Sequence, residues 1–342
     1  MPQLKKCVVW DLDNTLWDGV CLEGPVIVRK DVVGAIEELD RRGILHSVAS
    51  RGDSEIATAV LKANGLEAYF LVPRINWLPK SRNIVAITND LGISCDAVAF
   101  VDDDRFEREQ VSFMLPEVVT IASEDAGQLP NRAEFSPSHV TREAGRRRDF
   151  YRSDMVRKEA ERQSASREGF LSSCEMRLCI RPMKGGDIPR VQELMTRTHQ
   201  LNTSGLMLDE AELTHLFSRT NGPLNLFVAE LNDRFGEYGI VGTAMIDPAP
   251  PRWRLKYLAV SCRVMGRGIE RAILSTLVSK GIRDGYKIIE ASFRDTGRNR
   301  MMRALYQMMG FREKPRIEKD QTIVLAADPG GIPNIPRWIT IV

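Results

Sequence analysis

Short apolar runs that end in polar residues mark the first third of the chain. Residues 7–10, 44–50 and 97–101 are largely hydrophobic, with valine in each. Runs of this length and composition predict strands buried in a sheet. Aspartate follows the first and third runs at once, and the second closes on serine. The pattern therefore predicts three buried strands with polar side chains at their ends.

The second half of the chain predicts a different mixture of helices and strands. An aspartate cap opens an amphipathic helix over residues 187–198, and a further helix is predicted over residues 269–284. The two middle strands of this half are expected to pair in an antiparallel manner. The predicted strands are residues 176–182, 224–231, 239–247 and 253–260.

A polar stretch separates the two halves. It opens with Pro, Asn and Ser residues and becomes rich in Arg, Glu, Lys and Gln over residues 142–167. This composition predicts a solvated helix that bridges two domains, with residues 146–148, three arginines, on an exposed face. We expect an N-terminal domain over residues 1–130, a helical linker over 131–165 and a second domain over 166–342.

Composition agrees with two globular domains. The chain has 342 residues, of which 27% are charged and 43% hydrophobic, and this length favours two cores. It shows neither an apolar stretch of membrane-spanning length nor a signal-peptide pattern. Its six cysteines lack zinc-like spacing. We therefore expect a cytoplasmic protein with reduced thiols and no membrane partner.

Charge is distributed unevenly along the chain. Residues 1–130 carry 13 Lys and Arg against 21 Asp and Glu, whereas residues 252–312 carry 14 against 4, a balance of +10. The basic segment favours an anionic partner such as a phosphorylated ligand or an acidic protein. Because no nucleic-acid motif accompanies it, nucleic acid is not expected as a partner.

Two carboxylates follow the first predicted strand, in the string Asp11-Leu12-Asp13-Asn14-Thr15. One carboxylate can attack a phosphoryl group while the other acts as acid and base. A bound Mg²⁺ would neutralise charge that otherwise repels a phosphate, and it prefers carboxylate oxygens. The motif therefore predicts phosphoryl transfer, with Asp11 as nucleophile and Asp13 as acid/base.

This motif resembles the haloacid dehalogenase (HAD) phosphotransferase superfamily, and further motifs follow in order. The resemblance implies a Rossmann-like α/β domain with a parallel sheet, in which Mg²⁺ is the cofactor. The implied metal ligands are Asp11, Asp13, Asp102 and Asp103. The residues implied to bind the substrate phosphate are Thr15, Ser50, Arg51 and Lys80.

A glycine loop follows the strand over residues 253–260. The string Arg263-Val264-Met265-Gly266-Arg267-Gly268 leads directly into the helix at 269–284, an arrangement that can hold a phosphate on backbone N–H groups. With the string at residues 305–311 it resembles the GNAT acyltransferase fold, an α+β domain. The resemblance implies that Arg263, Gly266, Arg267 and Gly268 bind a phosphopantetheine arm.

Cys262 lies at the end of that strand, immediately before the loop. A helix N-terminus and Arg263 favour the thiolate form, so Cys262 is the predicted acyl-transfer nucleophile. A small buried strand residue is the alternative for Cys262. Cys7 is expected in the core, and Cys21 is a rival nucleophile near the aspartate motif.

A polar run after the first helix of this half adds His199, Gln200 and Asn202. Such runs are often caps and turns. Their hydrogen-bonding groups also suit a polyol substrate, and His199 could act as a base for a thiol near neutral pH. Both interpretations stay open at this point.

The pairing of these two domains resembles FkbH-like proteins of polyketide pathways almost end to end. The resemblance implies transfer of a glyceryl unit from 1,3-bisphosphoglycerate to the phosphopantetheine thiol of an acyl carrier protein, with dephosphorylation. The product would be a starter unit or a precursor of methoxymalonyl-type extender units. The matching strings are residues 7–17, 100–103, 194–205, 261–268 and 298–303.

Three alternatives accompany this interpretation. The first is a plain phosphatase with a structural second domain. The second is an Mg-dependent HAD phosphatase joined to a separate acetyl-CoA-dependent GNAT acetyltransferase. The third is a non-catalytic scaffold for carrier proteins, which the complete set of phosphotransfer motifs disfavours.

Overall fold

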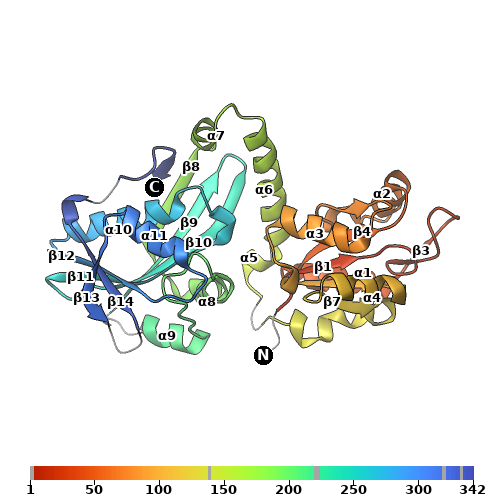
Figure 1. The fold of residues 1–342 in the computed structure, drawn as a ribbon, viewed down its shortest axis with the longest axis horizontal. Coiled ribbons are helices and arrows are strands. Elements are labelled where there is room, and N and C mark those ends of the chain that lie inside the picture. The colour runs from red at the N-terminus through yellow and green to blue at the C-terminus, as the bar shows by residue number, and fades with distance from the viewer. Residues whose placement is uncertain (1–3, 138–139, 219–223, 318–320, 332–333) are drawn as a thin grey trace. The chain divides into compact units, whose positions relative to one another are not determined.

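The computed structural model describes residues 4–137, 140–218, 224–317, 321–331 and 334–342 (Figure 1). Contacts divide the chain into two units, Met1–Met155 and Val156–Val342. The division falls inside helix α6 (Arg147–Arg162). Within the described residues, none of the helices is long and apolar enough to cross a membrane.

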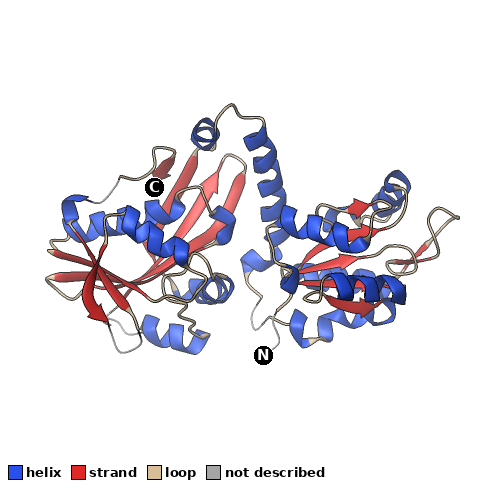
Figure 2. Cartoon of the chain, in the orientation of Figure 1, coloured by secondary structure: helices blue, strands red, loops and turns tan. Residues whose placement is uncertain are grey.

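Unit 1 is built on a five-stranded parallel sheet in the order β5-β4-β1-β6-β7 (Figures 1 and 2). The central strand β1 is buried along its whole length, which explains its continuous apolar run. The strands are β1 (Cys7–Trp10), β4 (Leu45–Ser50), β5 (Arg74–Ile75), β6 (Val98–Asp102) and β7 (Val119–Ala122). A small hairpin, β2 (Trp17–Asp18) and β3 (Ile27–Val28), follows β1.

Helices cover both faces of this sheet. Alternate residues of β1 point to opposite faces, so Val8 packs with α1 and α2, whereas Val9 packs with α3 and α4. The four helices are α1 (Lys30–Arg41), α2 (Ser54–Ala63), α3 (Lys80–Leu91) and α4 (Arg105–Met114). This layering leaves the carboxyl edge of the sheet to the loops that carry the aspartates.

Unit 2 holds a mixed eight-stranded sheet in the order β13-β14-β12-β11-β10-β9-β8-β15. Its long central strands are β9 (Asn225–Asp233), β10 (Gly236–Asp247) and β11 (Arg252–Val260), which pair in an antiparallel manner. The remaining strands are β8 (Met176–Pro182), β12 (Ile288–Phe293), β13 (Arg312–Ile317), β14 (Ile323–Ala327) and β15 (Ile339–Ile341). β12 runs parallel to β11, and β15 runs parallel to β8.

Two pairs of helices cover the faces of this second sheet. Helices α10 (Ile269–Arg283) and α11 (Arg300–Met308) share one core with the sheet, and α7 (Arg167–Ser173) joins them through Phe170. Helices α8 (Ile188–Arg197) and α9 (Glu210–Ser218) pack on the other face. The helices predicted at residues 187–198 and 269–284 therefore pack on opposite faces of one sheet.

The polar stretch between the halves differs from its prediction. It forms three helices, α5 (Arg142–Gly145), α6 and α7, in place of one continuous helix. The expected exposed arginine face is wrong at Arg147, which is 9% exposed and donates a hydrogen bond to the Gly43 carbonyl at 2.6 Å. Arg148 lies over the Tyr69 ring at 4.5 Å. These arginines anchor the end of unit 1 because carbonyl and aromatic partners are available there.

Candidate active sites

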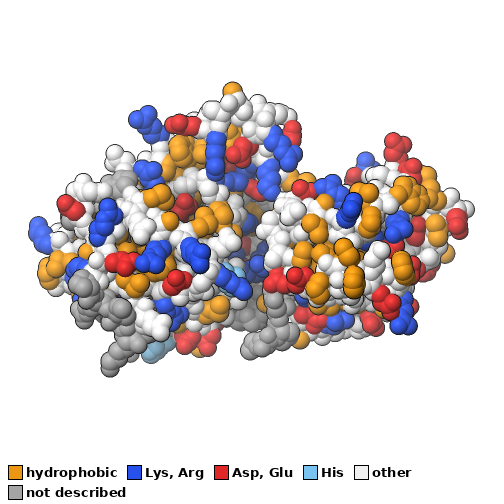
Figure 3. Space-filling view, viewed as in Figure 1, with side chains coloured by type: hydrophobic (Ala, Val, Ile, Leu, Met, Phe, Trp, Pro, Cys, Tyr) orange, Lys and Arg blue, Asp and Glu red, His pale blue; other side chains and the backbone are white. Residues whose placement is uncertain are grey.

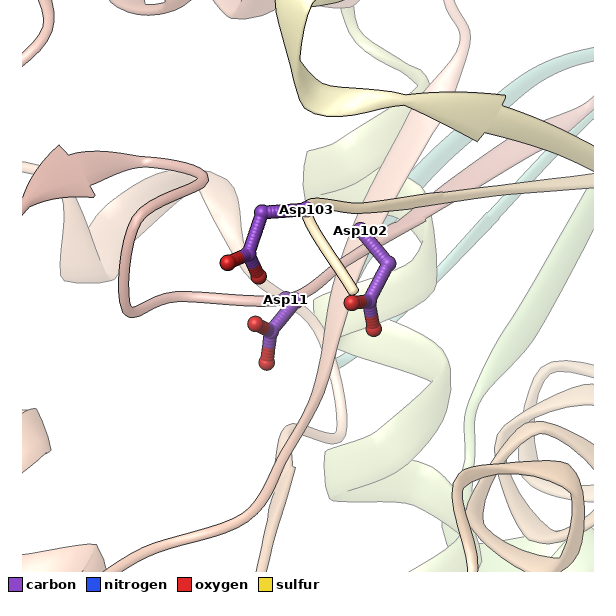
Figure 4. Close-up of side chains that lie close together, drawn as sticks. All are labelled: Asp11, Asp102 and Asp103. Atoms are coloured by element: carbon purple, nitrogen blue, oxygen red, sulfur yellow. The ribbon is translucent and has the colours of Figure 1, made fainter. Parts of the chain in front are cut away.

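Three carboxylates meet at the carboxyl edge of the sheet in unit 1 (Figure 4). Asp11 follows β1, Asp102 ends β6, and Asp103 begins the loop after β6. Because β1 and β6 are parallel neighbours, they deliver these residues to the same edge. One oxygen from each residue lies within 4.8 Å of the others. Asp11 and Asp102 are 5% and 0% exposed, so solvent screens their charges weakly.

Lys80, the first residue of α3, neutralises part of this negative charge. Its Nζ lies 3.0 Å from Asp11 Oδ1 and 2.5 Å from Asp102 Oδ2. Burial acts to lower the pKa of Lys80, but Asp11 and Asp102 together raise it above its ordinary value. The lysine is therefore a fixed positive charge between the two carboxylates.

The carboxylates still carry more negative charge than one lysine can offset. Burial raises the pKa of Asp11 although Lys80 opposes the shift. Burial and the neighbouring Asp11 raise the pKa of Asp102 to about 7. Such shifts indicate a cluster that lacks positive charge, and hard oxygen ligands in this arrangement suit Mg²⁺. Asp11, Asp102 and Asp103 would hold the ion.

Asp13, expected as a fourth ligand, lies outside the three-carboxylate cluster. Its Oδ1 accepts hydrogen bonds from the Trp17 indole at 2.7 Å and from the Cys21 backbone at 3.0 Å. These contacts tie Asp13 to the hairpin that follows β1. Its position in the loop directly after Asp11 is compatible with an acid/base role.

Thr15 and Ser50 hold the acidic residues in place. Thr15 is fully buried, and its hydroxyl accepts a hydrogen bond from the Asp103 backbone at 3.1 Å. The Ser50 hydroxyl, at the end of β4, donates a hydrogen bond to Asp11. Thr15 thus fixes the backbone at Asp103, whereas Ser50 lies beside the predicted nucleophile.

Arg51 and Arg108 complete the surroundings. Arg51 pairs with Glu107 at 2.9 Å, with 42% of its side chain exposed. Arg108 donates to the backbone carbonyls of Asp102 and Asp103 at 2.7 and 2.8 Å, so it fixes the loop that carries both carboxylates. Arg108 was not predicted from the sequence, although its place one turn into the helix after the aspartates was an available signal.

The glycine loop of unit 2 connects β11 to α10. Cys262 is exposed and begins a single 3₁₀ turn, Cys262–Val264. Gly266 and Gly268 have φ angles of +76° and +80°, which glycine adopts without steric cost. Gly268 caps α10 without a side-chain hydrogen bond. The first N–H groups of a helix lack intrahelical partners, so this end can receive an anion.

The two arginines of the loop turn toward β10. The guanidinium of Arg263 donates to the Tyr238 carbonyl at 3.1 Å. The guanidinium of Arg267 donates to the Tyr238 hydroxyl and lies over its ring, with a carbon-to-centroid distance of 5.3 Å. Both side chains therefore brace the loop from within unit 2.

The polar run after α8 divides into exposed and buried positions. His199 and Gln200 are exposed, whereas Asn202 is 1% exposed. The Asn202 amide donates to Thr198 and Tyr257 at 3.2 and 3.0 Å. Its oxygen accepts from two following backbone N–H groups, at 3.1 and 2.9 Å. The structure thus uses the Asn202 side chain to shape its own loop.

This loop also completes the edge of β11. β11 pairs with β12 only over residues 252–255, and segment 201–203 bonds with its last residues. The Thr203 backbone donates to Leu258 at 3.0 Å, and Val260 donates to Leu201 at 2.9 Å. The segment that carries the polar run is therefore fixed to the strand that ends beside Cys262.

Cys7, expected in the core, and Cys21, the rival nucleophile, both lie in surroundings that disfavour the thiolate form. Cys7 is fully buried in β1, and burial raises the pKa of its thiol. Partial burial and the nearby Asp13 raise the pKa of Cys21 to about 11, so it is a protonated thiol at neutral pH. Cys262 is the exposed cysteine at a strand end.

Basic side chains are spread over the face of unit 2 drawn in Figure 3. The exposed basic residues among the described part of the basic segment 252–312 are Lys280, Arg283, Lys287, Arg298, Arg300 and Arg312. Opposite charge on a partner would be attracted by the summed field of many such residues. The positive charge of this segment is therefore spread over the surface and is not concentrated at one residue.

Comparison with protein families matches residues 188–311 to the acetyltransferase (GNAT) family. No curated protein matches the chain. Among solved structures, the N-terminal, phosphatase-containing part of a Bacteroides fragilis protein, solved with Mg, is 29% identical and has a TM-score of 0.34; 39% of each chain is covered. The Escherichia coli ribosomal-protein-S18-alanine N-acetyltransferase is 18% identical over 44% of this chain and 92% of its own, with a TM-score of 0.34.

A Thermoplasma acidophilum N-acetyltransferase, solved with coenzyme A, is 12% identical over 44% of this chain and 98% of its own, with a TM-score of 0.36. The expected fold class is confirmed: a parallel-sheet α/β unit precedes a GNAT-like unit with a mixed sheet. The C-terminal half of the chain thus carries a domain of the GNAT acetyltransferase type.

Proposed function

We propose that this protein transfers a glyceryl unit from 1,3-bisphosphoglycerate to the phosphopantetheine thiol of an acyl carrier protein and removes phosphate. The observation that carries the proposal is the pairing of two sites in one chain. Unit 1 has the lysine-braced carboxylate cluster, and unit 2 has an exposed Cys262 ahead of a glycine loop. The resemblance to FkbH-like proteins supports the choice of substrate and acceptor.

Phosphate removal is assigned to unit 1. A carboxylate oxygen of Asp11 attacks phosphorus, the bond from phosphorus to the glyceryl oxygen breaks, and Asp13 protonates the leaving oxygen. Water then hydrolyses the aspartyl phosphate and restores Asp11. Lys80 and Ser50 hold the nucleophile through the contacts described above. Asp11, Asp102 and Asp103 would hold an Mg²⁺ ion, which would supply positive charge to offset that of the phosphate.

Acyl transfer is assigned to unit 2. The Cys262 thiolate attacks the carbonyl carbon of the acyl phosphate, and the carbon–oxygen bond breaks as phosphate departs with the electron pair. The carrier thiol, deprotonated by His199, then attacks the thioester carbonyl and releases the Cys262 thiolate. The start of α10 is proposed to receive the phosphate of the carrier arm.

The test is to incubate the protein with 1,3-bisphosphoglycerate in the absence of a carrier. We expect a glyceryl or phosphoglyceryl mass on the peptide that contains Cys262. Hydroxylamine should release this added group, because it cleaves thioesters. Cys262→Ala should lose the label and keep phosphatase activity toward a phosphomonoester. Cys262→Ser should restore little transfer, because an un-ionised hydroxyl is the poorer nucleophile.

Three other outcomes would revise the proposal. A label on Cys21 would move the acyl chemistry beside the carboxylate cluster and leave unit 2 as a docking platform. Full carrier loading by Cys262→Ala with no labelled cysteine would mean direct transfer to the carrier thiol. Acetylation of an amine from acetyl-CoA, unaffected by loss of Cys262, would instead favour an ordinary acetyltransferase.

A further inference from the structure

Residues outside the matched GNAT region hold the glycine loop by its backbone carbonyls. Arg167, which begins α7, donates from its guanidinium to the Gly266 carbonyl at 2.7 Å. Trp338 donates from its indole to the Arg267 carbonyl at 2.9 Å. The matched region covers residues 188–311, so these contacts come from before it and after it. The loop is therefore fixed by the flanking segments of unit 2 as well as by its own strand and helix.

Tyr238 connects the side chains of the same loop to the core. It is 2% exposed, and its hydroxyl donates to Asp233 Oδ2 at 3.0 Å while it accepts from Arg267. Its backbone carbonyl accepts from Arg263. One buried tyrosine thus accepts hydrogen bonds from both loop arginines and donates one to the Asp233 carboxylate.

Arg157 of helix α6 completes the chain of contacts. Its Nε and terminal nitrogen lie 2.7 and 2.9 Å from the two oxygens of Asp233, a bidentate pair. The two side chains are 1% and 0% exposed, and the guanidinium lies 4.0 Å from the centre of the Tyr238 ring. A bidentate, buried pair has a defined geometry, so it fixes the direction of the tyrosine hydroxyl.

We propose that Arg157, Asp233 and Tyr238 are positioning residues for the acyl-transfer loop, acting through Arg263 and Arg267. Because both arginine side chains are hydrogen-bonded to Tyr238, the loop binds the anionic carrier arm through the backbone N–H groups at the start of α10. The linker helix is then part of the acyl-transfer site. The binding of the carrier arm rests on the proposed function, whereas the positioning of the loop by these three residues does not.

The tyrosine hydroxyl separates this role from simple stabilisation. Asp233 also accepts from the backbone of Phe235 and Gly236 at 2.9 and 3.1 Å, which holds the β9–β10 turn independently of the loop. Tyr238→Phe removes one oxygen and leaves the ring, the turn and the Arg157–Asp233 pair in place. It therefore uncouples Arg267 from the buried pair without emptying the core.

The experiment compares Tyr238→Phe with Tyr286→Phe in the full-length protein. Tyr286 is a matched control, because its hydroxyl donates to the Pro248 carbonyl at 3.3 Å in the same unit and touches no loop residue among the described contacts. Hydrogen exchange is measured at the loop amides of Val264, Met265 and Arg267, which donate within the loop. Carrier loading and phosphate release are measured in parallel.

Tyr238→Phe should speed exchange at these amides by about tenfold and raise the KM for the carrier by a similar factor, as expected for loss of a hydrogen bond to a charged group. The kcat and the phosphate release of Tyr238→Phe should stay near the parent values. Tyr286→Phe should match the parent protein in loop exchange, KM, kcat and phosphate release. Unchanged exchange in Tyr238→Phe would overturn the positioning role. Faster exchange with an unchanged KM would overturn its link to the carrier.

If the parent protein loads no carrier at all, the proposed function fails while the exchange measurement still decides whether Tyr238 holds the loop. A drop in melting temperature shared by both variants, with identical loop exchange, would assign Tyr238 a purely structural role. Arg157→Lys keeps the buried charge but loses the bidentate geometry, and it should shift loop exchange in the same direction as Tyr238→Phe.

Discussion

Asp11→Asn should remove phosphatase activity and leave unit 1 folded. The change preserves the shape of the side chain but removes the nucleophilic carboxylate, and loss of a covalent nucleophile costs on the order of 10⁶ in kcat. Stability should change little, because the substitution removes both favourable and unfavourable charge contacts. Lys80 keeps Asp102 as a partner at 2.5 Å, so it is not left as an uncompensated buried charge.

The size of the stability effect follows from the distances. At an effective dielectric constant of about 20, the attraction lost between Asp11 and Lys80 at 3.0 Å is roughly 5 kcal/mol. The repulsion lost at the same time, taken at the 4.8 Å limit of the separation, is roughly 3 kcal/mol from each of Asp102 and Asp103. The two effects nearly cancel, so the free energy of unfolding should change by less than about 2 kcal/mol.

The assay measures phosphate released from a phosphomonoester with Mg²⁺, together with the thermal midpoint of each variant. Asp104→Asn is the matched control, since Asp104 lies in the same loop as Asp103 but caps α4 through the Phe106 backbone at 2.8 Å. It should retain activity. Normal phosphate release by Asp11→Asn would refute the assignment of the nucleophile, and an unfolded Asp11→Asn would refute the charge balance.

Four further expectations can be tested separately. Asp13→Asn should slow phosphate release by ~10²-fold or more, as measured by steady-state kinetics, if Asp13 is the acid/base. EDTA should abolish phosphate release and added Mg²⁺ should restore it; full activity in EDTA would exclude the metal. Carrier loading by the parent protein should weaken as the salt concentration rises, and more steeply than loading by the double variant Arg298→Glu, Arg300→Glu. Loading by the parent that does not change with salt would exclude electrostatic docking. Burial lowers the pKa of His46 from 6.5 to about 3, so the neutral side chain contributes its full stability above pH 6.5 and loses it as the pH falls toward 3. At pH 5 the free energy of unfolding should be lower by about 2 kcal/mol on this account. In urea unfolding, His46→Gln should therefore lose less stability in acid than the parent protein.

Local patterns predicted the elements that carry the sites. The apolar run at residues 7–10 is β1, because a strand buried on both faces requires continuous hydrophobic residues. The helix predicted over 269–284 is α10 (Ile269–Arg283), since its start follows a glycine loop and its buried residues recur with helical spacing. These elements place Asp11 and Cys262 where strands end.

Local sequence patterns could not predict contacts between segments that are distant along the chain. Arg147 looks solvent-exposed in sequence, yet it is buried against the Gly43 carbonyl. Asn202 resembles a ligand-binding polar residue, but its hydrogen bonds close its own loop. The partners of Tyr238 come from α6, the β9–β10 turn and the glycine loop, so the strand pattern of β10 alone contains no sign of its role.

Intact mass measurement of an acyl carrier protein tests the central claim most directly. The carrier is incubated with the protein, Mg²⁺ and 1,3-bisphosphoglycerate, and the parent should add a glyceryl mass without phosphate to its phosphopantetheine arm. Cys262→Ala should leave the carrier unloaded, and Asp11→Asn should prevent the appearance of the dephosphorylated product. A carrier that stays unmodified with the parent protein, while phosphate is still released from 1,3-bisphosphoglycerate, would contradict the account.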